Sequence, residues 1–560
     1  MKKRVIYAAT AALMFAAGSA FAQSTSNTAT STQAGVTNTS TIDQLGGISN
    51  TAATTQSGDN NVASTLQDGG MLNSAAATQD GSANVASIVQ TGGAGNVADI
   101  NQAGITNDAL IEQSGGVGNN ADVDQTGDLN IATVFQTDGV DNDADVDQVG
   151  SANDAYVEQT GGENNEADID QEGAGNIATI FQTDGEDNDA DIEQDGLDND
   201  GYIDQFEGED NDAEIDQDGD LNVASIFQYG GEDNEADIDQ EGISNFAIVD
   251  QTGGEDNDAD VEQDGESNSA LVVQSGGEDN DSDVDQDGYM NSAFTGQYGG
   301  DNNDADVDQV GDMNTAMVDQ IGGMDHTADI EQVGDGNYAS IMQMAGWEND
   351  TDVYQHGDDN TAEVAQLFGG DNDAYVHQDG LSNVASVVQM GGEDNTAIIN
   401  QDGASNSAST YQMGGMDNTA DIMQDGSMNS AYVQQLGGLN NSAAVSQVGT
   451  SNTADVYQTG GFYNEATVDQ SGVSNTGVIS QSFAAFSEAS ILQDGDLNSA
   501  DISQSGMMNT ASVSQAGLMN TASISQSGSS NTSTISQMGS GSSATSTQSG
   551  SGNVSTITQH

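Results

Sequence analysis

The chain has 560 residues, with 92 Asp and Glu against 3 Lys and Arg, 70 Gly, no Pro and no Cys, and its formal net charge is −89. This balance excludes nucleic acid as a partner, because phosphate binding needs cationic side chains, and the lack of Cys excludes a disulfide framework. High charge with low hydrophobicity is typical of a disordered acidic polymer. That interpretation is the alternative against which the periodicity of the chain has to be weighed.

The N-terminus is typical of a secretory signal peptide, which we predict over residues 1–22. Three basic residues at 2–4 precede a short apolar stretch at 5–17 and a small-residue cleavage site, Ala-Phe-Ala, at 20–22. The mature chain is expected to begin at Gln23, to cross the periplasm and to be extracellular. Removal of the three basic residues takes the net charge from −89 to −92. The apolar stretch is too short to span a bilayer, so no transmembrane span is predicted.

The remainder of the chain is one long repeat. Glutamines recur at spacings that alternate between 11 and 12 from Gln33 to Gln493, and then at a uniform 11 as far as Gln559, which gives 47 arms. This pattern predicts a solenoid over residues 23–493 and Ser/Thr-rich C-terminal rungs of the same solenoid over 494–560. No boundary of a globular domain fits inside the repeat.

Each arm reads Asn-x-Ala-x-(Val/Ile)-x-Gln and is followed by a Gly-containing link. Residues 142–148, Asn-Asp-Ala-Asp-Val-Asp-Gln, are an example. Strict alternation over seven residues predicts a β-strand with two chemically distinct faces. The links have four residues (149–152) or five (160–164), and Gly in second place supplies the positive φ of a tight turn.

Two strands and two links make a rung of 23 residues, so the chain is predicted to be all-β. We expect a parallel, in-register β-solenoid of about 23 rungs, whose strands stack about 4.7–4.9 Å apart. Amphipathic helices are excluded, because the alternating residues would be scattered around a helix.

The predicted interior is half apolar and half amide. Val and Ile are expected to be buried, Ala is expected to face Ala across the rod, and each Asn or Gln amide is expected to bond to the identical amide on the next rung. The residues assigned to this structural amide ladder are Asn130, Gln136, Asn142, Gln148, Asn176, Gln182, Asn188 and Gln194.

The outward positions predict two different faces. In eight consecutive arms of one kind, ending at Gln148 through Gln309, all three outward residues are acidic. Stacked carboxylates at about 4.8 Å repel each other by about 0.9 kcal/mol per neighbour in bulk water. We therefore hypothesise that Ca²⁺ or acid strengthens folding and lateral association. The hypothetical calcium face comprises Asp143, Asp145, Asp147, Glu166, Asp168, Asp170, Asp189, Asp191 and Glu193.

The other kind of arm is expected to present an apolar and hydroxylated strip, exemplified by Ile131, Thr133 and Phe135. A continuous strip of this kind favours a lateral contact between fibres or an adhesive surface.

The repeat resembles a known family. Residues 125–136, Gln-Thr-Gly-Asp-Leu-Asn-Ile-Ala-Thr-Val-Phe-Gln, resemble the curlin repeat of curli amyloid subunits. The resemblance implies self-association into extracellular fibres, export by a dedicated outer-membrane secretion machinery, a nucleator subunit, and a role in biofilm matrix and surface adhesion. It also implies that Gln and Asn of the arms form the amide ladders. The chain departs from the family in its many more repeats, in its acidity and in an arm that begins as early as Asn27.

Catalytic and metal-binding signals are weak. The four histidines, His326, His356, His377 and His560, share no spacing with a nucleophile or a metal partner, so no enzyme is predicted and no cofactor is required, with Ca²⁺ as an optional ligand. An EF-hand-like opening at 283–288 has Phe294 where a bidentate Glu is needed.

Two alternative functions stay open. The first is a calcium-binding secreted β-roll, since residues 253–258 are similar to its nonapeptide, although the period here is not nine. The second is a soluble acidic adhesin rod. An ice- or surface-binding solenoid would need more regular rows of Thr.

One irregularity interrupts the pattern. The link at 482–486 has no Gly, Ser487 replaces Asn, and the spacing changes immediately afterwards. We predict a cap or a kink at this point and expect the C-terminal end to be the least stable. The ends of the stack expose unpaired backbone, which favours growth by end-to-end addition.

Overall fold

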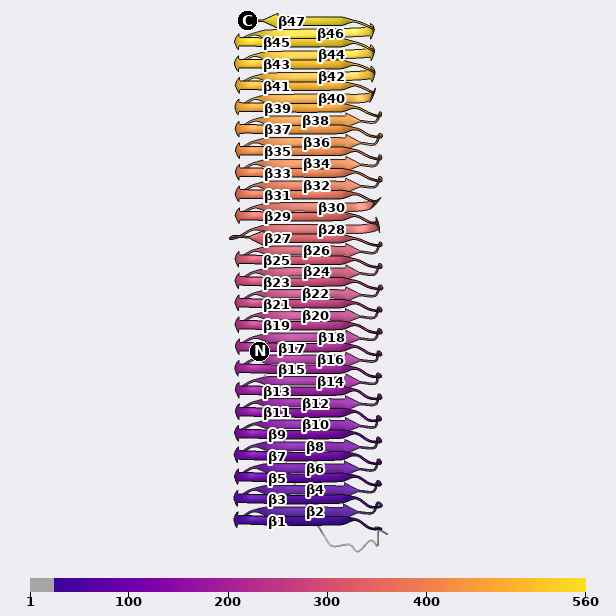
Figure 1. Cartoon of the computed structure of the whole chain (residues 1–560), viewed down its shortest axis with the longest axis vertical. Helices are drawn as coiled ribbons and strands as arrows, with labels where there is room; N and C mark the ends of the chain where they lie inside the picture. Colours follow the sequence, from indigo (N-terminus) through magenta and orange to yellow (C-terminus); the bar gives the residue numbers. More distant parts are fainter. Residues whose placement is uncertain (1–24) are drawn as a thin grey trace, which may run out of the picture.

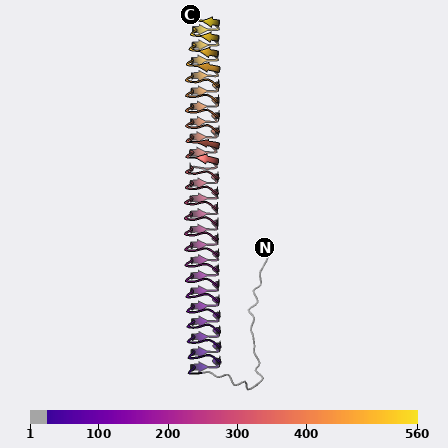
Figure 2. The same ribbon diagram turned by 90° about the vertical axis from the view of Figure 1, so that its right-hand side faces the viewer.

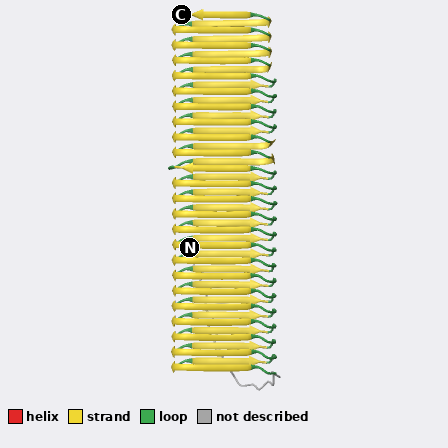
Figure 3. Ribbon diagram, viewed as in Figure 1, coloured by secondary structure: helices red, strands yellow, loops and turns green. Residues whose placement is uncertain are grey.

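The protein is a straight rod of stacked β-strands (Figure 1). The computed structural model describes residues 25–560, so the predicted signal peptide lies outside the described residues. Over this range the chain forms 47 strands and no helix (Figure 3). Seen from the side, the two layers of strands make a narrow column (Figure 2).

Strands with odd numbers form one sheet and strands with even numbers the other, and we name these the odd sheet and the even sheet. The strands of the odd sheet are β1 (Thr28–Val36), β3 (Thr51–Asp59), β5 (Ser74–Ser82), β7 (Val97–Ile105), β9 (Asn120–Asp128), β11 (Asp143–Ser151), β13 (Glu166–Ala174), β15 (Asp189–Leu197), β17 (Asp212–Asp220), β19 (Glu235–Ile243), β21 (Asp258–Glu266), β23 (Asp281–Tyr289), β25 (Asp304–Asp312), β27 (Thr327–Val333), β29 (Asp350–Asp358), β31 (Asp373–Leu381), β33 (Thr396–Ala404), β35 (Thr419–Ser427), β37 (Ser442–Thr450), β39 (Glu465–Val473), β41 (Glu488–Asp496), β43 (Thr510–Leu518), β45 (Thr532–Ser540) and β47 (Val554–Gln559).

The strands of the even sheet are β2 (Thr39–Leu45), β4 (Val62–Asp68), β6 (Val85–Thr91), β8 (Asp108–Ser114), β10 (Ile131–Thr137), β12 (Asp154–Thr160), β14 (Ile177–Thr183), β16 (Asp200–Phe206), β18 (Val223–Tyr229), β20 (Phe246–Thr252), β22 (Ser269–Ser275), β24 (Ser292–Tyr298), β26 (Thr315–Ile321), β28 (Tyr338–Trp347), β30 (Thr361–Gly370), β32 (Val384–Met390), β34 (Ser407–Met413), β36 (Ser430–Leu436), β38 (Thr453–Thr459), β40 (Thr476–Ala485), β42 (Ser499–Met507), β44 (Thr521–Ser529) and β46 (Ser543–Ser551).

The pairing within each sheet is parallel and in register. Gln148 of β11 is aligned with Gln125 of β9 on one side and with Gln171 of β13 on the other, so equivalent positions of the repeat stack directly on one another. The same relation holds from β10 to β12 in the even sheet. The predicted fold class, a parallel in-register β-solenoid of two-strand rungs, is confirmed.

The limits of the strands differ slightly from the seven-residue strands that the arms predict. β11 begins at Asp143, one residue after the Asn of the arm, and continues to Ser151 through most of the expected four-residue link. Parallel pairing extends this far because the Gly of each such link is aligned with the Gly of the next rung. Gly219 illustrates why Gly is needed there: its φ is 131°, and a Cβ on it would collide with the carbonyl oxygen of Gly242.

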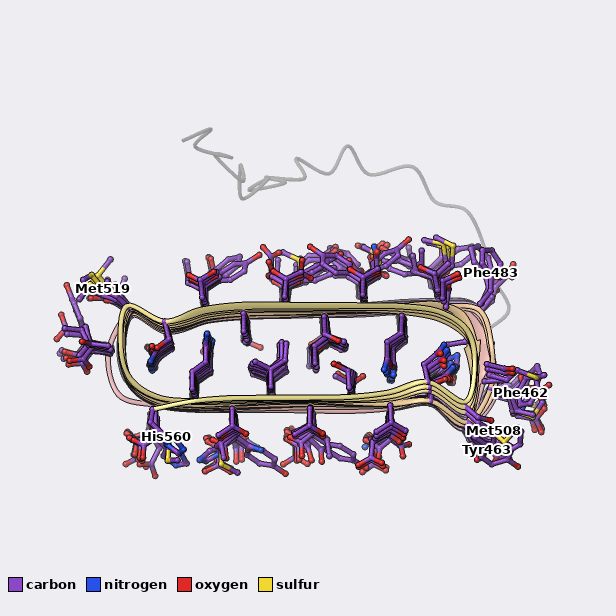
Figure 4. The ribbon with its side chains drawn as sticks, turned by 90° about the horizontal axis from the view of Figure 1, so that it is seen from above. Phe462, Tyr463, Phe483, Met508, Met519 and His560 are labelled. Carbon is purple, nitrogen blue, oxygen red and sulfur yellow. The ribbon has the colours of Figure 1, made fainter. Side chains whose placement is uncertain are left out.

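The interior matches the expected apolar and amide composition but not the expected facing of Ala on Ala (Figure 4). Val and Ile of the arms are fully buried; Ile192 is 0% exposed. The atom nearest to a Cβ built on Gly201, which occupies an Ala position of β16, would be Cγ2 of Ile192, 2.9 Å away. The two strands of a rung run in opposite directions, and this places each Ala opposite a Val or Ile of the other sheet. Small and large side chains therefore fill the core in pairs.

The core tolerates polar pairs at the same facing positions. Ser282 stands at an Ala position, Thr295 stands at the facing Val/Ile position, and their hydroxyl oxygens are hydrogen-bonded at 2.6 Å. Ser533 donates to Ser546 in the same way at 2.8 Å. Both sites show that an Ala position meets a Val/Ile position across the rod.

Of the cap or kink expected at residues 482–487, the cap is wrong. The stack continues through this region to β47, and the irregularity is a register shift between Ser482 and Ala485, where β40 pairs with β42. After it, neighbouring rungs are offset by 22 residues instead of 23, as Gln493 to Gln515 shows. The chain can change its link length here because only an outer link is affected and the interior positions stay aligned.

Candidate functional site: amide columns and outer faces

The glutamines of each sheet form a continuous hydrogen-bonded column inside the rod. Nε2 of Gln182 donates to Oε1 of Gln205 on the next rung at 2.9 Å, and to the carbonyl oxygen of Glu166 in the facing sheet at 2.6 Å. The other glutamines of the predicted ladder, Gln136, Gln148 and Gln194, donate to the next rung at 2.8, 2.8 and 2.7 Å. Each buried amide therefore links one rung to the next and one sheet to the other, which removes the cost of burying it.

The asparagines behave differently from the direct amide-to-amide expectation. Oδ1 of Asn142 accepts from the backbone N–H of Asn165 on the next rung at 3.1 Å, and its Nδ2 donates to the carbonyl oxygen of Gly161 at 2.7 Å. Oδ1 of Asn130 and of Asn176 likewise accepts from a backbone N–H of the next rung, at 3.2 and 3.1 Å. The Asn side chain is one methylene shorter than Gln and lies where the chain enters a strand, so it satisfies the backbone of the links instead.

Parts of both Asn columns also have the expected side-chain bonds, as Asn337 to Asn314 at 3.2 Å shows for the even sheet, and among the four predicted ladder asparagines Asn188 has one. Oδ1 of Asn188 accepts from Nδ2 of Asn211 at 3.3 Å, as well as from its backbone N–H at 3.1 Å. The structure thus brings Asn130, Asn142, Asn176 and Asn188 into stacked columns, but as caps of the links more than as amide ladders.

The nine residues of the hypothetical calcium face lie on adjacent strands of the odd sheet. Register places Asp145 on Asp168 and Asp168 on Asp191, with the flanking carboxylates stacked in parallel columns. In the middle column Asp168 and Asp191 are half-buried, whereas Asp145 is exposed. Burial, followed by repulsion from Asp168 and Glu214, raises the pKa of Asp191 to about 7, and burial with repulsion from Asp145 raises that of Asp168 to about 6.

The columns supply carboxylate oxygens that could bind cations, but these oxygens do not converge on a common centre. Among residues 25–560 there is no group of three or more His, Asp or Glu that could hold a metal ion. The flat sheet is the reason, because carboxylates in parallel columns point outward side by side rather than towards a common centre. This geometry favours a diffuse layer of cations over a coordinated one.

The outer face of the even sheet carries an aromatic series that the sequence reasoning only partly found. Rings on successive rungs pack with their centroids 5.4–5.8 Å apart, in the order Phe135, Tyr156, Phe181, Tyr202 and Phe227. The sequence analysis gave Phe135 as an example of this strip, whereas it missed the Tyr on the intervening rungs. A period of 46 residues, two rungs, was the signal that could have found them.

The outer face of the even sheet also carries more carboxyl groups than expected. Asp154 and Asp200 lie on its first outward position, and burial raises the pKa of both carboxyls. The hydroxyl of Tyr156 donates to Oε2 of Glu158 at 2.6 Å. The face is therefore a mixed strip of aromatic, hydroxyl and carboxyl groups.

The histidines are not as isolated as their spacing indicated. The rings of His356 and His377 lie 6.0 Å apart on β29 and β31, and Nε2 of His356 is 3.6 Å from Oε1 of Glu331. Their separation of 21 residues is two short of a rung, which makes them diagonal neighbours on one face. His326 occupies a buried Asn position, as expected, and burial lowers the pKa of its imidazole.

The five-residue links form a column of their own along one edge of the rod. Their fourth residues are joined by single parallel bridges, and they are acidic from Glu163 to Asp301 but mostly apolar beyond Met324. Near the C-terminal end, Phe462 and Tyr463 lie on this edge (Figure 4). The ring of Phe486 packs against them, with its centroid 5.2 and 5.3 Å from theirs.

No helix in the described part of the chain is long and apolar enough to cross a membrane.

Comparison with known protein families identifies one family. The family model described as the curlin associated repeat matches twelve times, over residues 116–148, 139–164, 162–196, 185–219, 208–232, 231–255, 254–288, 300–334, 346–380, 415–449, 487–517 and 520–550. No curated protein matches the chain.

Proposed function

Because this chain belongs to the family of proteins built from curlin associated repeats, we propose that it is a structural subunit of an extracellular, curli-like amyloid fibre. In this role the fibre supports a biofilm matrix and adhesion to surfaces, and the chain has no catalytic activity. Residues 1–22 are its signal peptide, and a dedicated outer-membrane machinery and a nucleator subunit serve its export and assembly.

One observation carries the proposal: among residues 25–560, the strands at both ends of the stack have a free edge. Within this range β1 and β2 are paired on one side only, with β3 and β4, and β46 and β47 are paired on one side only, with β44 and β45. An uncovered strand edge is a template for another strand. The whole interior is already in the parallel, in-register arrangement of cross-β fibres, so addition of a further chain extends the same order.

The test is whether the mature chain, residues 23–560, grows beyond the length of one molecule. Purified protein is incubated in physiological salt and examined by negative-stain microscopy, thioflavin T fluorescence and fibre diffraction. Filaments much longer than a single rod, with a reflection near 4.7–4.8 Å along the fibre axis, are expected. Particles that stay at one rod length at all concentrations would replace the fibre by the soluble acidic adhesin rod.

The carboxylate columns support a second element of the proposal, a dependence on cations. We propose that Ca²⁺ acts on the nine-residue acidic face as a screening counterion and not at a single coordinated site. Thioflavin T kinetics with Ca²⁺, with the same ionic strength of Na⁺, and at pH 4 against pH 7 test this idea. Faster growth with Ca²⁺ and with acid is expected, because both reduce the charge of the columns. Saturation at a fixed stoichiometry would instead favour a calcium-binding β-roll.

A further inference from the structure

The two ends of the rod carry matching strands. β46 reads Ser-Ala-Thr-Ser-Thr-Gln-Ser-Gly-Ser and β1 reads Thr-Ala-Thr-Ser-Thr-Gln-Ala-Gly-Val; both have nine residues, and Ala, Thr, Ser, Thr, Gln and Gly coincide. β47 reads Val-Ser-Thr-Ile-Thr-Gln, and the first six residues of β2 read Thr-Ser-Thr-Ile-Asp-Gln. The last two strands thus match the first two as closely as successive rungs of the rod match each other.

The number of strands decides where a second copy would begin. Within residues 25–560 the odd sheet has 24 strands and the even sheet 23, so after β47 the next position along the solenoid lies in the even sheet, above β46. From this geometry we propose that chains join end to end with a half-turn about the rod axis. In this arrangement β1 of the incoming copy pairs with β46, and its β2 pairs with β47. The proposal rests on the proposed fibre function and specifies its joint.

The interior of the joint is chemically continuous. At the Val/Ile position of the arms, Ser occurs twice in the described chain, at Ser31 and at Ser546. The half-turn places these two directly on one another. Ser31 donates to Ser40 in its own rung at 3.0 Å, and Ser546 accepts from Ser533 at 2.8 Å, so the hydroxyl pairs of the two ends become one column.

At the C-terminal end of the rod, the glutamine columns can donate to the glutamines of a further rung. Throughout the rod each Gln donates to the next rung in the C-terminal direction, as Gln526 does to Gln548 at 2.8 Å. In the part of the chain that the structure describes, Gln548 and Gln559 donate only to backbone carbonyls of the facing sheet, at 2.9 and 3.1 Å. The half-turn sets Gln33 above Gln548 and Gln44 above Gln559, where their Oε1 atoms complete both columns.

Charge and link length also agree with this joint. Residues 502–560 contain no Asp or Glu, and β1 and β2 together contain one, Asp43, so the ends meet without the repulsion of the middle rungs. After the register shift at Ser482, the even strands β42, β44 and β46 have nine residues instead of the usual seven. This change gives the even sheet the same strand length as β1, which would not fit on a seven-residue strand and its five-residue link.

The direct, unrotated register fits poorly. Placing β1 on β47 would stack Ser31 on Ile557 and leave an empty position above β46. A hydroxyl on an isoleucine column, next to a missing strand, loses both the packing and the amide bonds that hold every other rung.

Cysteine crosslinking distinguishes the two registers, because the chain has no Cys of its own. Thr30 and Thr545 point outward and are aligned only after the half-turn, whereas Thr30 and Thr556 are aligned only without it. The double variants T30C/T545C and T30C/T556C of the mature chain are assembled under reducing conditions and then mildly oxidised. Each is checked for β circular dichroism and filaments before non-reducing electrophoresis. Aligned strands bring the two Cα atoms within the range for a disulfide.

We expect T30C/T545C to give a ladder of covalent oligomers and T30C/T556C to give roughly tenfold fewer. Filaments in which T30C/T556C crosslinks instead, or in which neither pair crosslinks, would overturn the half-turn joint and leave the fibre function standing. Absence of filaments in the unsubstituted chain would overturn both.

Discussion

The middle of the rod and its two ends share one interior and differ in their outer face. β15 buries Ala, Ile and Gln and directs Asp189, Asp191 and Glu193 outward, while β45 buries Ser, Ile and Gln and directs Thr532, Thr534 and Ser536 outward. The same fold therefore supports a heavily charged surface and a neutral one. The comparison teaches that the stack depends on what points inward, and that the outer positions are free to decide where chains repel and where they meet.

Stacking multiplies both the stabilisation by the inward side chains and the repulsion between outward carboxylates, because each position is repeated on every rung. A buried Val or Ile contributes roughly 1.5–3 kcal/mol each time it recurs. A column of carboxylates repels along its whole length, and burial, followed by this repulsion, raises the pKa of Asp122 and of Asp237 in the middle column to about 7. The neutral ends avoid this cost where a second copy has to approach.

The largest expected effect comes from moving a carboxylate from the outer face to the inner one. Ile192→Asp puts a charge at a position that is 0% exposed, with no cation to pair it. We expect a loss of roughly 4 kcal/mol or more in the stability of the surrounding rungs. Thermal unfolding and limited proteolysis of the mature chain measure it.

The matched control puts the same carboxylate on the outer face of a neutral rung. Thr534→Asp lies on β45, and we expect a change within about 0.5 kcal/mol, as for ordinary surface substitutions. Equal destabilisation by the two variants would show that composition, and not direction, determines where charge is tolerated.

A smaller effect is expected from pH, and it should be strongest in the acidic middle of the rod and weakest in the C-terminal rungs, which have no Asp or Glu after residue 501. Burial and the neighbouring carboxylates raise the folded pKa of Asp191 to about 7 from the ordinary value of 3.8, so between these values the folded chain binds more protons than the unfolded one. Stability then rises as pH falls from about 7 towards 4 and levels off below. Hydrogen exchange, corrected for intrinsic rates, should show stronger protection of β9–β25 at pH 5 than at pH 7.5, with little change in β43–β47.

Neutralisation of the middle column provides the control for this pH effect. The triple variant D145N/D168N/D191N removes three adjacent carboxylates that the structure stacks on one another. It should be more stable than the unsubstituted chain at pH 7.5 and should lose much of the pH dependence locally. An unchanged pH profile would locate the titration elsewhere.

The smallest effect is expected from the polar pair in the core. Ser282→Ala leaves the hydroxyl of Thr295 without its partner, which costs about 1–3 kcal/mol, whereas S282A/T295V replaces both and should be near neutral. Denaturant unfolding of the two variants measures the difference. A double variant as unstable as the single one would contradict the pairing of Ala with Val/Ile positions across the rod.

The repeat made most of the fold predictable. Alternation within residues 142–148 indicated the two faces, and the 11/12 spacing indicated the 23-residue rung, because each inward position must recur in register to be buried. The Gln columns followed from the same argument. The exact strand limits did not, since β11 continues through Gly150 only because the next rung aligns with it.

Other features depended on how the chain folds back on itself. Asn142 bonds to backbone groups of the links, and the ring of His356 lies against that of His377. Both contacts join residues of different rungs, so the sequence of a single arm does not predict them. A residue's neighbour on the next rung lies 22 or 23 residues away, and a diagonal neighbour lies at a different offset, so local patterns do not display these contacts.

By itself the sequence determined the strands, the period and the identity of the inward side chains, because the alternation of polar and apolar residues is a local property. Only the tertiary structure decided which position faces which across the core and which groups the Asn amides bond to. The facing depends on the opposite directions of the two strands in a rung, as the pair of Ser282 with Thr295 shows. The physical reason is that facing positions are properties of the closed coil as a whole, whereas a strand needs only its own seven to nine residues.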